Sequence, residues 1–282
     1  MKKLVLCLLA VFASGALGAD KIRALIFTGS SDYSHPWEPN VPYMRAALNN
    51  TGKFDVKVEE EVRGITSATL ANYDLIVQYY YGPRWPAVTE KAVEDFLRSG
   101  KGMITVHGVT YGPFFGQAGG NPQEPQRRMD GDPWTAYSEM MGMYWKIENI
   151  GHARRGVFPV QWQDREHPIS KGLPPIFLAD DELYHKIDLK PKAHVLATAH
   201  EEPGPRNTGT GKDEPMIWTV PFGEGRVVVM TLGHDLLAMT QQGFTTAFIR
   251  GAEWAATGNV TPAVPQSPSR NPAGTGTPAK GQ

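Results

Sequence analysis

The chain has 282 residues, a formal net charge of −1 and 41% hydrophobic residues. This composition suits a soluble globular protein with a sizeable core. A net charge so close to zero argues against a nucleic acid or an anionic membrane surface as the partner.

The N-terminal segment has the pattern of an export signal. Two lysines precede an apolar run, Leu4–Ala13, and small residues then lead to Ala19, where cleavage is expected. The run is too short to span a bilayer comfortably, so we predict a signal peptide at residues 1–19, a secreted periplasmic protein and no stable membrane insertion after cleavage. An uncleaved anchor and a lipoprotein are the alternatives. Cleavage would remove Cys7, which is the only cysteine, and this would exclude disulfides, thiol nucleophiles and thiolate metal sites.

The C-terminal segment, residues 261–282, is rich in Pro, Gly, Ser and Thr and has almost nothing to bury. It is predicted to be disordered. The folded part is therefore expected to be one α/β domain over residues 20–260.

Short apolar runs alternate with helical patterns along the folded part. The predicted elements are strands at 22–29, 54–60, 73–80 and 103–106, helices at 42–50, 86–98 and 244–257, and two further strands around the turn FGEG within 215–235. The glycine- and aromatic-rich stretch 114–155 is interpreted as a functional insertion or a lid. This alternation predicts a parallel sheet with helices on both faces, in which ligands bind at the carboxyl ends of the strands.

Two histidines follow predicted buried strands. His107 lies between the run MITV and Gly108, and His234 follows Gly233. A neutral imidazole at such a position can transfer a proton near neutral pH or ligate a metal. A histidine that is merely hydrogen-bonded within the core is the alternative. Asp235 is positioned either to orient His234 or to cap the following helix.

The stretch ADDELYHKI, Ala179–Ile187, places three acidic residues beside Tyr184. Glu182 is the candidate for a carboxylate that faces the site, as a general acid/base or as a ligand. Asp180 and Asp181 are expected to face solvent or to cap a turn.

Aromatic and polar residues also follow the first and third predicted strands. His35 and Trp37 follow the first strand, and Tyr81 and Arg84 follow the third. Aromatic rings beside hydrogen-bonding groups suit a sugar, which has an apolar ring face and polar hydroxyls. Alternatively, these loops only pack over the sheet.

With these residues assembled, the sequence resembles the trehalose-utilisation (ThuA-like) family. The matching motifs run in order over nearly the whole folded region: ALIFTGSSDYSH, GKGMITVHG, HPISKGLP, DELYH and GEGRVVVMTLGHD, with Trp254 in the final helix. The resemblance implies a fold like that of the class I glutamine amidotransferases, a flavodoxin-like three-layer sandwich with a mostly parallel sheet.

The resemblance also relates His107 to an amidotransferase nucleophile. Amidotransferases of this fold place a cysteine at the turn that holds His107 and a catalytic histidine where His234 lies. Their supporting glutamate would fall on Leu236, which cannot serve. Without a thiol, no covalent glutaminyl intermediate can form at this turn, so glutamine amidotransferase activity is not expected.

The resemblance links the chain instead to the use of disaccharides, including 3-keto sugars, whose oxidised ring makes neighbouring protons acidic. It implies acid/base or metal-assisted chemistry at His107, His234 and Glu182, and two histidines with a carboxylate would suffice to bind a divalent metal such as zinc. The residues expected around a small-molecule sugar are His35, Trp37, Tyr81, Arg84, Tyr184 and Asp235. A non-catalytic carbohydrate-binding or accessory protein is the alternative function, and a homo-oligomer is left open.

Overall fold

The computed structural model describes residues 20–29, 35–82, 84–107, 134–144, 151–203 and 209–261. The predicted signal peptide, all but the first residue of the predicted tail, and most of the 114–155 insertion lie outside the described residues. None of the described helices is long and apolar enough to cross a membrane.

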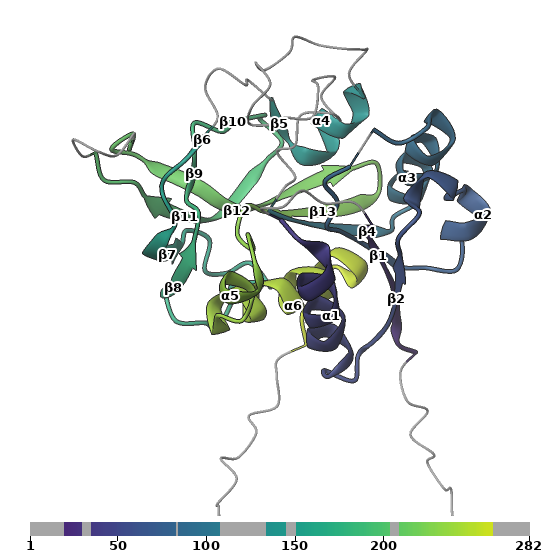
Figure 1. Ribbon diagram of the computed structural model, residues 1–282, viewed down its shortest axis with the longest axis horizontal. Coiled ribbons are helices and arrows are strands. Elements are labelled where there is room, and N and C mark those ends of the chain that lie inside the picture. Colours follow the sequence, from purple (N-terminus) through teal and green to yellow (C-terminus); the bar gives the residue numbers. More distant parts are fainter. Residues whose placement is uncertain are drawn as a thin grey trace, which may run out of the picture.

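A nine-stranded sheet forms the centre of the described chain, with the strand order β2-β1-β3-β4-β13-β12-β11-β7-β8 (Figure 1). In chain order its strands are β1 (Ile22–Phe27), β2 (Phe54–Glu59), β3 (Leu75–Gln78), β4 (Gly102–Val106), β7 (Gly156–Trp162), β8 (Ile176–Asp181), β11 (His194–His200), β12 (Asp213–Phe222) and β13 (Gly225–Met230). Two-stranded ribbons are formed by β5 (Met143–Tyr144) with β10 (Asp188–Leu189), and by β6 (Gly151–His152) with β9 (Tyr184–His185).

The strand directions divide the sheet into two halves. Strands β2, β1, β3, β4 and β13 are parallel, whereas β12, β11, β7 and β8 each run antiparallel to their neighbours. The predicted α/β class is confirmed, but the sheet is mixed rather than mostly parallel. The reason is local, because Phe222 pairs with Gly225 across a two-residue turn, and so short a connection joins only antiparallel strands.

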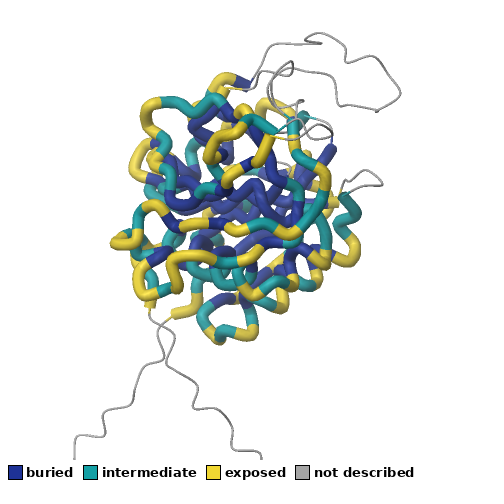
Figure 2. Tube along the Cα trace, turned by 90° about the vertical axis from the view of Figure 1, so that its left-hand side faces the viewer, coloured by how far each residue is buried: buried dark blue, intermediate teal, exposed yellow. Residues whose placement is uncertain are grey.

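Helices cover both faces of the sheet and form three layers with it. On one face lie α1 (Trp37–Asn49), α5 (Leu236–Met239) and α6 (Gln242–Thr257), and on the other lie α2 (Ser67–Leu70), α3 (Ala87–Arg98) and α4 (Thr135–Met141), with a short 3-10 helix at Val62–Gly64 (Figure 1). Alternate residues of β1 feed the two cores, Ala24 and Ile26 one, and Leu25 and Phe27 the other. Figure 2 shows the buried strands inside a shell of exposed loops and helix surfaces.

Helix α1 begins earlier than predicted. The sequence placed its start at Pro42, because proline is typical of a first turn, but the helix already begins at Trp37. Val41, Met44 and Leu48 recur at helical spacing and are buried against the sheet. This packing outweighs the single backbone hydrogen bond that Pro42 cannot donate.

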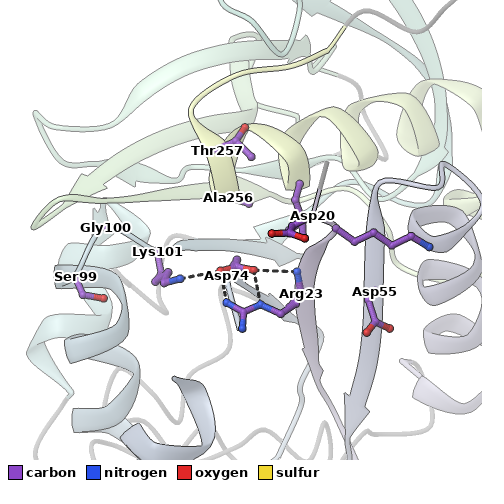
Figure 3. Close-up of a pocket in the computed structure, with 11 residues that line it drawn as sticks. Asp20, Arg23, Asp55, Asp74, Ser99, Gly100, Lys101, Ala256 and Thr257 are labelled. Atoms are coloured by element: carbon purple, nitrogen blue, oxygen red, sulfur yellow. Dashed lines mark hydrogen bonds and ion pairs between the residues drawn. The ribbon is translucent and has the colours of Figure 1, made fainter. Parts of the chain in front are cut away.

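A charged cleft lies at the amino ends of β1 and β4 (Figure 3). Asp74 accepts hydrogen bonds from Nε and Nη2 of Arg23, both at 2.9 Å, and from Nζ of Lys101 at 2.7 Å. These hydrogen bonds, those from Arg23 above all, hold the pKa of Asp74 well below its usual range. Because its charges pair with one another and ligands of parallel sheets bind at the opposite strand ends, we interpret this cleft as structural.

Replacing Asp74 by Asn is expected to lower the free energy of unfolding at pH 7 by about 1 kcal/mol, because the ion pairs are partly exposed. The folded-state pKa is depressed, so the wild-type stabilisation is present in full above the unfolded pKa near 3.8 and is lost progressively as the pH falls from there through the folded pKa. Urea unfolding at pH 7 and pH 3 measures both effects. Asp55→Asn, in the same cleft, is the control, and an undiminished difference at pH 3 would contradict the assignment.

Candidate functional site

Four side chains from separate parts of the chain meet beyond the carboxyl ends of the central strands. His107 follows β4, His234 comes shortly after β13, Glu182 follows β8, and His35 precedes α1. One ligand-type atom of each residue lies within 4.8 Å of the corresponding atoms of the other three. The structure thus brings together the three residues predicted to be catalytic and one that was predicted to bind the sugar.

The backbone at His107 has a conformation that residues with a side chain seldom adopt. Its φ is 53°, in the left-handed region, and its amide donates to the Met230 carbonyl at 2.7 Å. Such a conformation costs about 1 kcal/mol or more and persists where the surroundings hold it. The backbone is therefore strained at the residue that enters the cluster, whereas the tight turn expected at Gly108 lies outside the described residues.

The hydrogen position on the His107 ring follows from its contacts. Nδ1 lies 2.8 Å from the carbonyl oxygen of Thr231, which can only accept, so Nδ1 carries the hydrogen and Nε2 keeps a lone pair. Nε2 is fully buried and has no hydrogen-bond partner among the described residues. Burial, reinforced by the neighbouring His35 and His234, lowers the pKa of His107 well below its usual value. The imidazole is therefore neutral.

The His234 ring is oriented in the same way. Its Nδ1 lies 3.4 Å from Oδ2 of Asp235, a carboxylate that also accepts from the Ala238 amide at 3.0 Å and pairs with Arg155. Partial burial alone would raise the pKa of Asp235, but the hydrogen bonds from Arg155 and Ala238 lower it. The carboxylate is ionised and can only accept, which places the hydrogen on Nδ1 of His234. Asp235 therefore orients the imidazole and also caps α5.

Both imidazoles direct Nε2 at the same carboxylate, and the Nε2 atom of the neutral His107 carries a lone pair. Nε2 of His107 lies 3.7 Å from Oε2 of Glu182, and Nε2 of His234 lies 3.6 Å from Oε1. These distances are too long for hydrogen bonds. They approach the separation of about 3.4 Å between two ligand atoms of one tetrahedral zinc ion. Three electron-rich groups at this spacing favour a cation between them.

Aromatic rings line the cluster. The His35 ring stacks on Tyr81 with centroids 4.2 Å apart and planes 6° apart, and Tyr184 meets His107 edge-on at 5.1 Å. His152 lies beside the cluster as well, with Nδ1 3.5 Å from Oε1 of Glu182 and 45% of its side chain exposed. This arrangement provides apolar ring faces next to polar groups, as a sugar requires.

The sequence model of the ThuA family, described as trehalose utilisation, matches residues 23–255. The chain belongs to the ThuA family. A solved structure of a ThuA-like protein from Parabacteroides merdae is 26% identical and aligns over 88% of this chain and 94% of that chain, with a TM-score of 0.69.

A ThuA-like protein from Bacteroides uniformis is 16% identical over 88% of this chain and 98% of that chain, with a TM-score of 0.66. A cytoplasmic protein from Salmonella typhimurium is 12% identical over 83% of this chain and 99% of that chain, with a TM-score of 0.58. At these identities the two similarities show a shared fold alone. No protein of curated function matches the chain significantly by sequence.

Two residues of this ThuA chain that were predicted to contact the sugar have other contacts. Trp37 is the first residue of α1 and packs against the core, beside a groove that Val41 and Arg45 also line. Arg84 donates to both oxygens of Glu90 in the first turn of α3, at 2.6 and 2.9 Å. Both residues follow the expected strands, but packing and ion pairing, which the sequence pattern does not reveal, occupy their side chains.

The environment of Asp181 differs from the one predicted. It was predicted to face solvent or cap a turn, but it is 1% exposed, and its carboxylate accepts from the amides of Gly233 at 2.6 Å, His234 at 3.3 Å and Glu182 at 2.8 Å. Burial raises the pKa of Asp181 to about 6, against the lowering effect of these donors. Alternation along β8 would have indicated an inward Asp181, since Ala179 on the same face is buried too.

No sequence pattern indicated a role for His152 or Arg155 of this ThuA chain. His152 belongs to β6, a strand of two residues, which is too short for any periodic pattern. Arg155 lies just outside β6 and reaches Asp235, 80 positions further along the chain. Only tertiary contacts bring these two residues to the site.

The lowered pKa of His107 predicts how stability depends on pH. The unfolded chain takes up a proton at this residue near pH 6.5, whereas the folded chain does not. The free energy of unfolding of chelator-treated protein should therefore fall below pH 6.5, by at most about 1.4 kcal/mol per pH unit for this group. His107→Asn should reduce that slope, and the exposed His194→Asn serves as control. A His107 ring that titrates near pH 6.5 by NMR would contradict this assignment.

Proposed function

We propose that this ThuA-family protein performs acid/base chemistry, assisted by a divalent metal ion, on a disaccharide of the trehalose type or its 3-keto form. One observation carries the chemistry: the Nε2 atoms of His107 and His234 both face the Glu182 carboxylate at 3.6–3.7 Å. The family description, trehalose utilisation, supports the substrate class.

The donor set fits a transition metal better than magnesium or calcium. Three imidazoles and one carboxylate, from His35, His107, His234 and Glu182, lie within mutual reach of one ion. Nitrogen-rich sets of this kind suit zinc and its neighbours, whereas magnesium and calcium prefer oxygen. Once bound, such an ion polarises a carbonyl oxygen or acidifies a bound water.

The two histidines that follow the central strands differ in burial, which gives them different roles. His107 is fully buried, strained at its backbone and held in one tautomer, so we assign it the role of a rigid ligand. His234 is 17% exposed at its side chain. Three protein ligands suffice for a catalytic ion, so where His35, His107 and Glu182 hold the ion, Nε2 of His234 can accept the acidic proton next to a keto group. The rings of Tyr81 and Tyr184 are buried beside the cluster, at 5% and 9% exposure, so among the rings there a sugar would meet the partly exposed His35 and the exposed His152.

A second candidate function is carbohydrate binding without turnover. The parallel stack of His35 on Tyr81, 4.2 Å between centroids, favours it, because stacked aromatic rings also occur in sites that only bind sugars. Under this alternative, replacing Tyr81 would weaken sugar binding more than replacing His234 would.

The proposal also covers the setting of the protein. The export-signal pattern of residues 1–19 supports secretion to the periplasm, with a small sugar as the partner rather than nucleic acid. The parallel half of the sheet and the strained turn at His107 support the relationship to class I glutamine amidotransferases that the sequence resemblance implies. In this view a histidine stands where those enzymes carry a thiol.

Metal binding directly tests the observation on which the proposal rests, the approach of His107 and His234 to Glu182. After treatment with a chelator, the wild type is expected to bind one Zn²⁺ per chain in calorimetric titration. His107→Ala and Glu182→Gln should each weaken binding by about 100-fold or more, because each removes a ligand rather than one of the outer partners, whose loss costs about 10–100-fold. The exposed His194→Ala is the matched control. Absence of stoichiometric binding by the wild type would reject the metal site.

Activity is tested by mass-spectrometric screening of purified protein against disaccharides and their 3-keto forms, with and without chelator. Turnover of at least one sugar is expected, with loss on chelation and recovery on adding metal. His234→Ala should lower kcat by about 10²–10⁴-fold if its Nε2 transfers the proton, whereas His200→Ala should not. Sugar binding without any turnover would favour the second candidate function.

A further inference from the structure

We infer that Asp181 is the positioning residue that brings Glu182 and His234 together into one ion-binding cluster. The inference rests on the proposed function, since the ion is the ligand whose binding reports the geometry. Asp181 itself is not part of the four-residue donor set. It acts through the main chain of the residues that are.

The need for such a residue follows from the sheet. Glu182 follows β8, an edge strand, and His234 comes after β13, a central one, with β12, β11 and β7 between them in the strand order. The strand ladders therefore do not connect the two segments directly. A contact beyond the strand ends has to fix their separation, because a displacement of about 1 Å at a site can cost about 100-fold in rate.

The Asp181 carboxylate supplies this contact. It accepts from two consecutive amides of the β13 segment, Gly233 at 2.6 Å and His234 at 3.3 Å, and from the amide of Glu182 at 2.8 Å. Consecutive amides that converge on one anion form a concave, directional site. Both the position and the direction of the turn before His234 are thereby tied to the end of β8.

The opposite side of the turn is fixed by packing. Gly233 has a φ of 108°, and a Cβ at this position would lie 2.7 Å from both Phe244 and Val106. The turn is therefore held between the core on one side and the Asp181 carboxylate on the other. Asp235 sets the His234 tautomer, whereas Asp181 sets where the His234 backbone lies, so the two carboxylates have separate tasks.

The test replaces Asp181 by Asn, which keeps the shape but directs an NH2 group at one of the amides. Calorimetric Zn²⁺ affinity is expected to fall about 10–100-fold, as for the loss of other outer partners of metal sites. The visible spectrum of the Co²⁺-loaded variant should also change, because the coordination geometry is disturbed. A purely structural role would move the unfolding temperature but neither of these readouts.

Glu214→Gln is the matched control. Glu214 is also buried, at 5% exposure, and accepts from the Lys186 amide at 3.0 Å and the Thr210 hydroxyl at 2.7 Å, but it does not belong to the cluster. This variant should lose stability while its Zn²⁺ affinity stays within about 2-fold of the wild type. If Asp181→Asn binds Zn²⁺ as well as Glu214→Gln does, the inference is wrong.

Measurements on the wild type keep the inference testable if Asp181→Asn fails to fold. In the wild type, the amide protons of Gly233 and His234 should resonate downfield and exchange slowly with solvent, as expected for hydrogen bonds to a buried carboxylate. Fast exchange of both would overturn the inference. If the wild type binds no Zn²⁺, the proposed function fails, and the inference is then decided by whether Asp181→Asn shifts the His234 ring resonances more than Glu214→Gln does.

Discussion

The site depends on a close contact between two groups that form no hydrogen bond with each other, Nε2 of His107 and the Glu182 carboxylate. The Nε2 atom of His107 cannot donate to Glu182, because this imidazole is neutral and the Thr231 carbonyl fixes its ring hydrogen on Nδ1. A buried polar atom without a partner costs about 1–3 kcal/mol, and one such atom lies here beside a carboxylate. The fold holds these groups in place by main-chain hydrogen bonds and packing, so that the arrangement is ready for a cation.

The two ends of the sheet differ in whether their charged groups are paired with groups of opposite charge. At the amino ends the charges balance, because the cleft is lined by three acidic and three basic residues, Asp20, Asp55, Asp74, Lys21, Arg23 and Lys101. At the carboxyl ends, Glu182 faces the neutral imidazole of His107 without a hydrogen bond to it, and a positive charge between these two groups would stabilise both. The first arrangement stabilises the fold by itself, whereas the second is satisfied only when a cation or a proton is supplied. This contrast explains why we assign structure to one end and function to the other.

The mixed sheet makes the cluster possible. The parallel half brings the ends of β4 and β13 to the same edge, which is how His107 and His234 come to be neighbours. The antiparallel half ends in β8 and delivers Glu182 from the far edge of the sheet. A wholly parallel sheet would require crossover helices between β13 and β8, and these would have lengthened the chain considerably.

The sequence by itself predicted strands β1 to β4, β12 and β13, helices α1, α3 and α6, and the two strand-end histidines, but not β7, β8 or β11. Apolar periodicity and a glycine turn are local signals, and each depends on a few neighbouring residues. Only the tertiary structure decided that His35 and His152 reach the cluster, that Trp37 packs against the core and that Asp181 is buried. Those outcomes follow from contacts between segments such as β8 and the turn after β13, about 50 residues apart. No pattern within either segment encodes such a contact, because its energy exists only after both have folded.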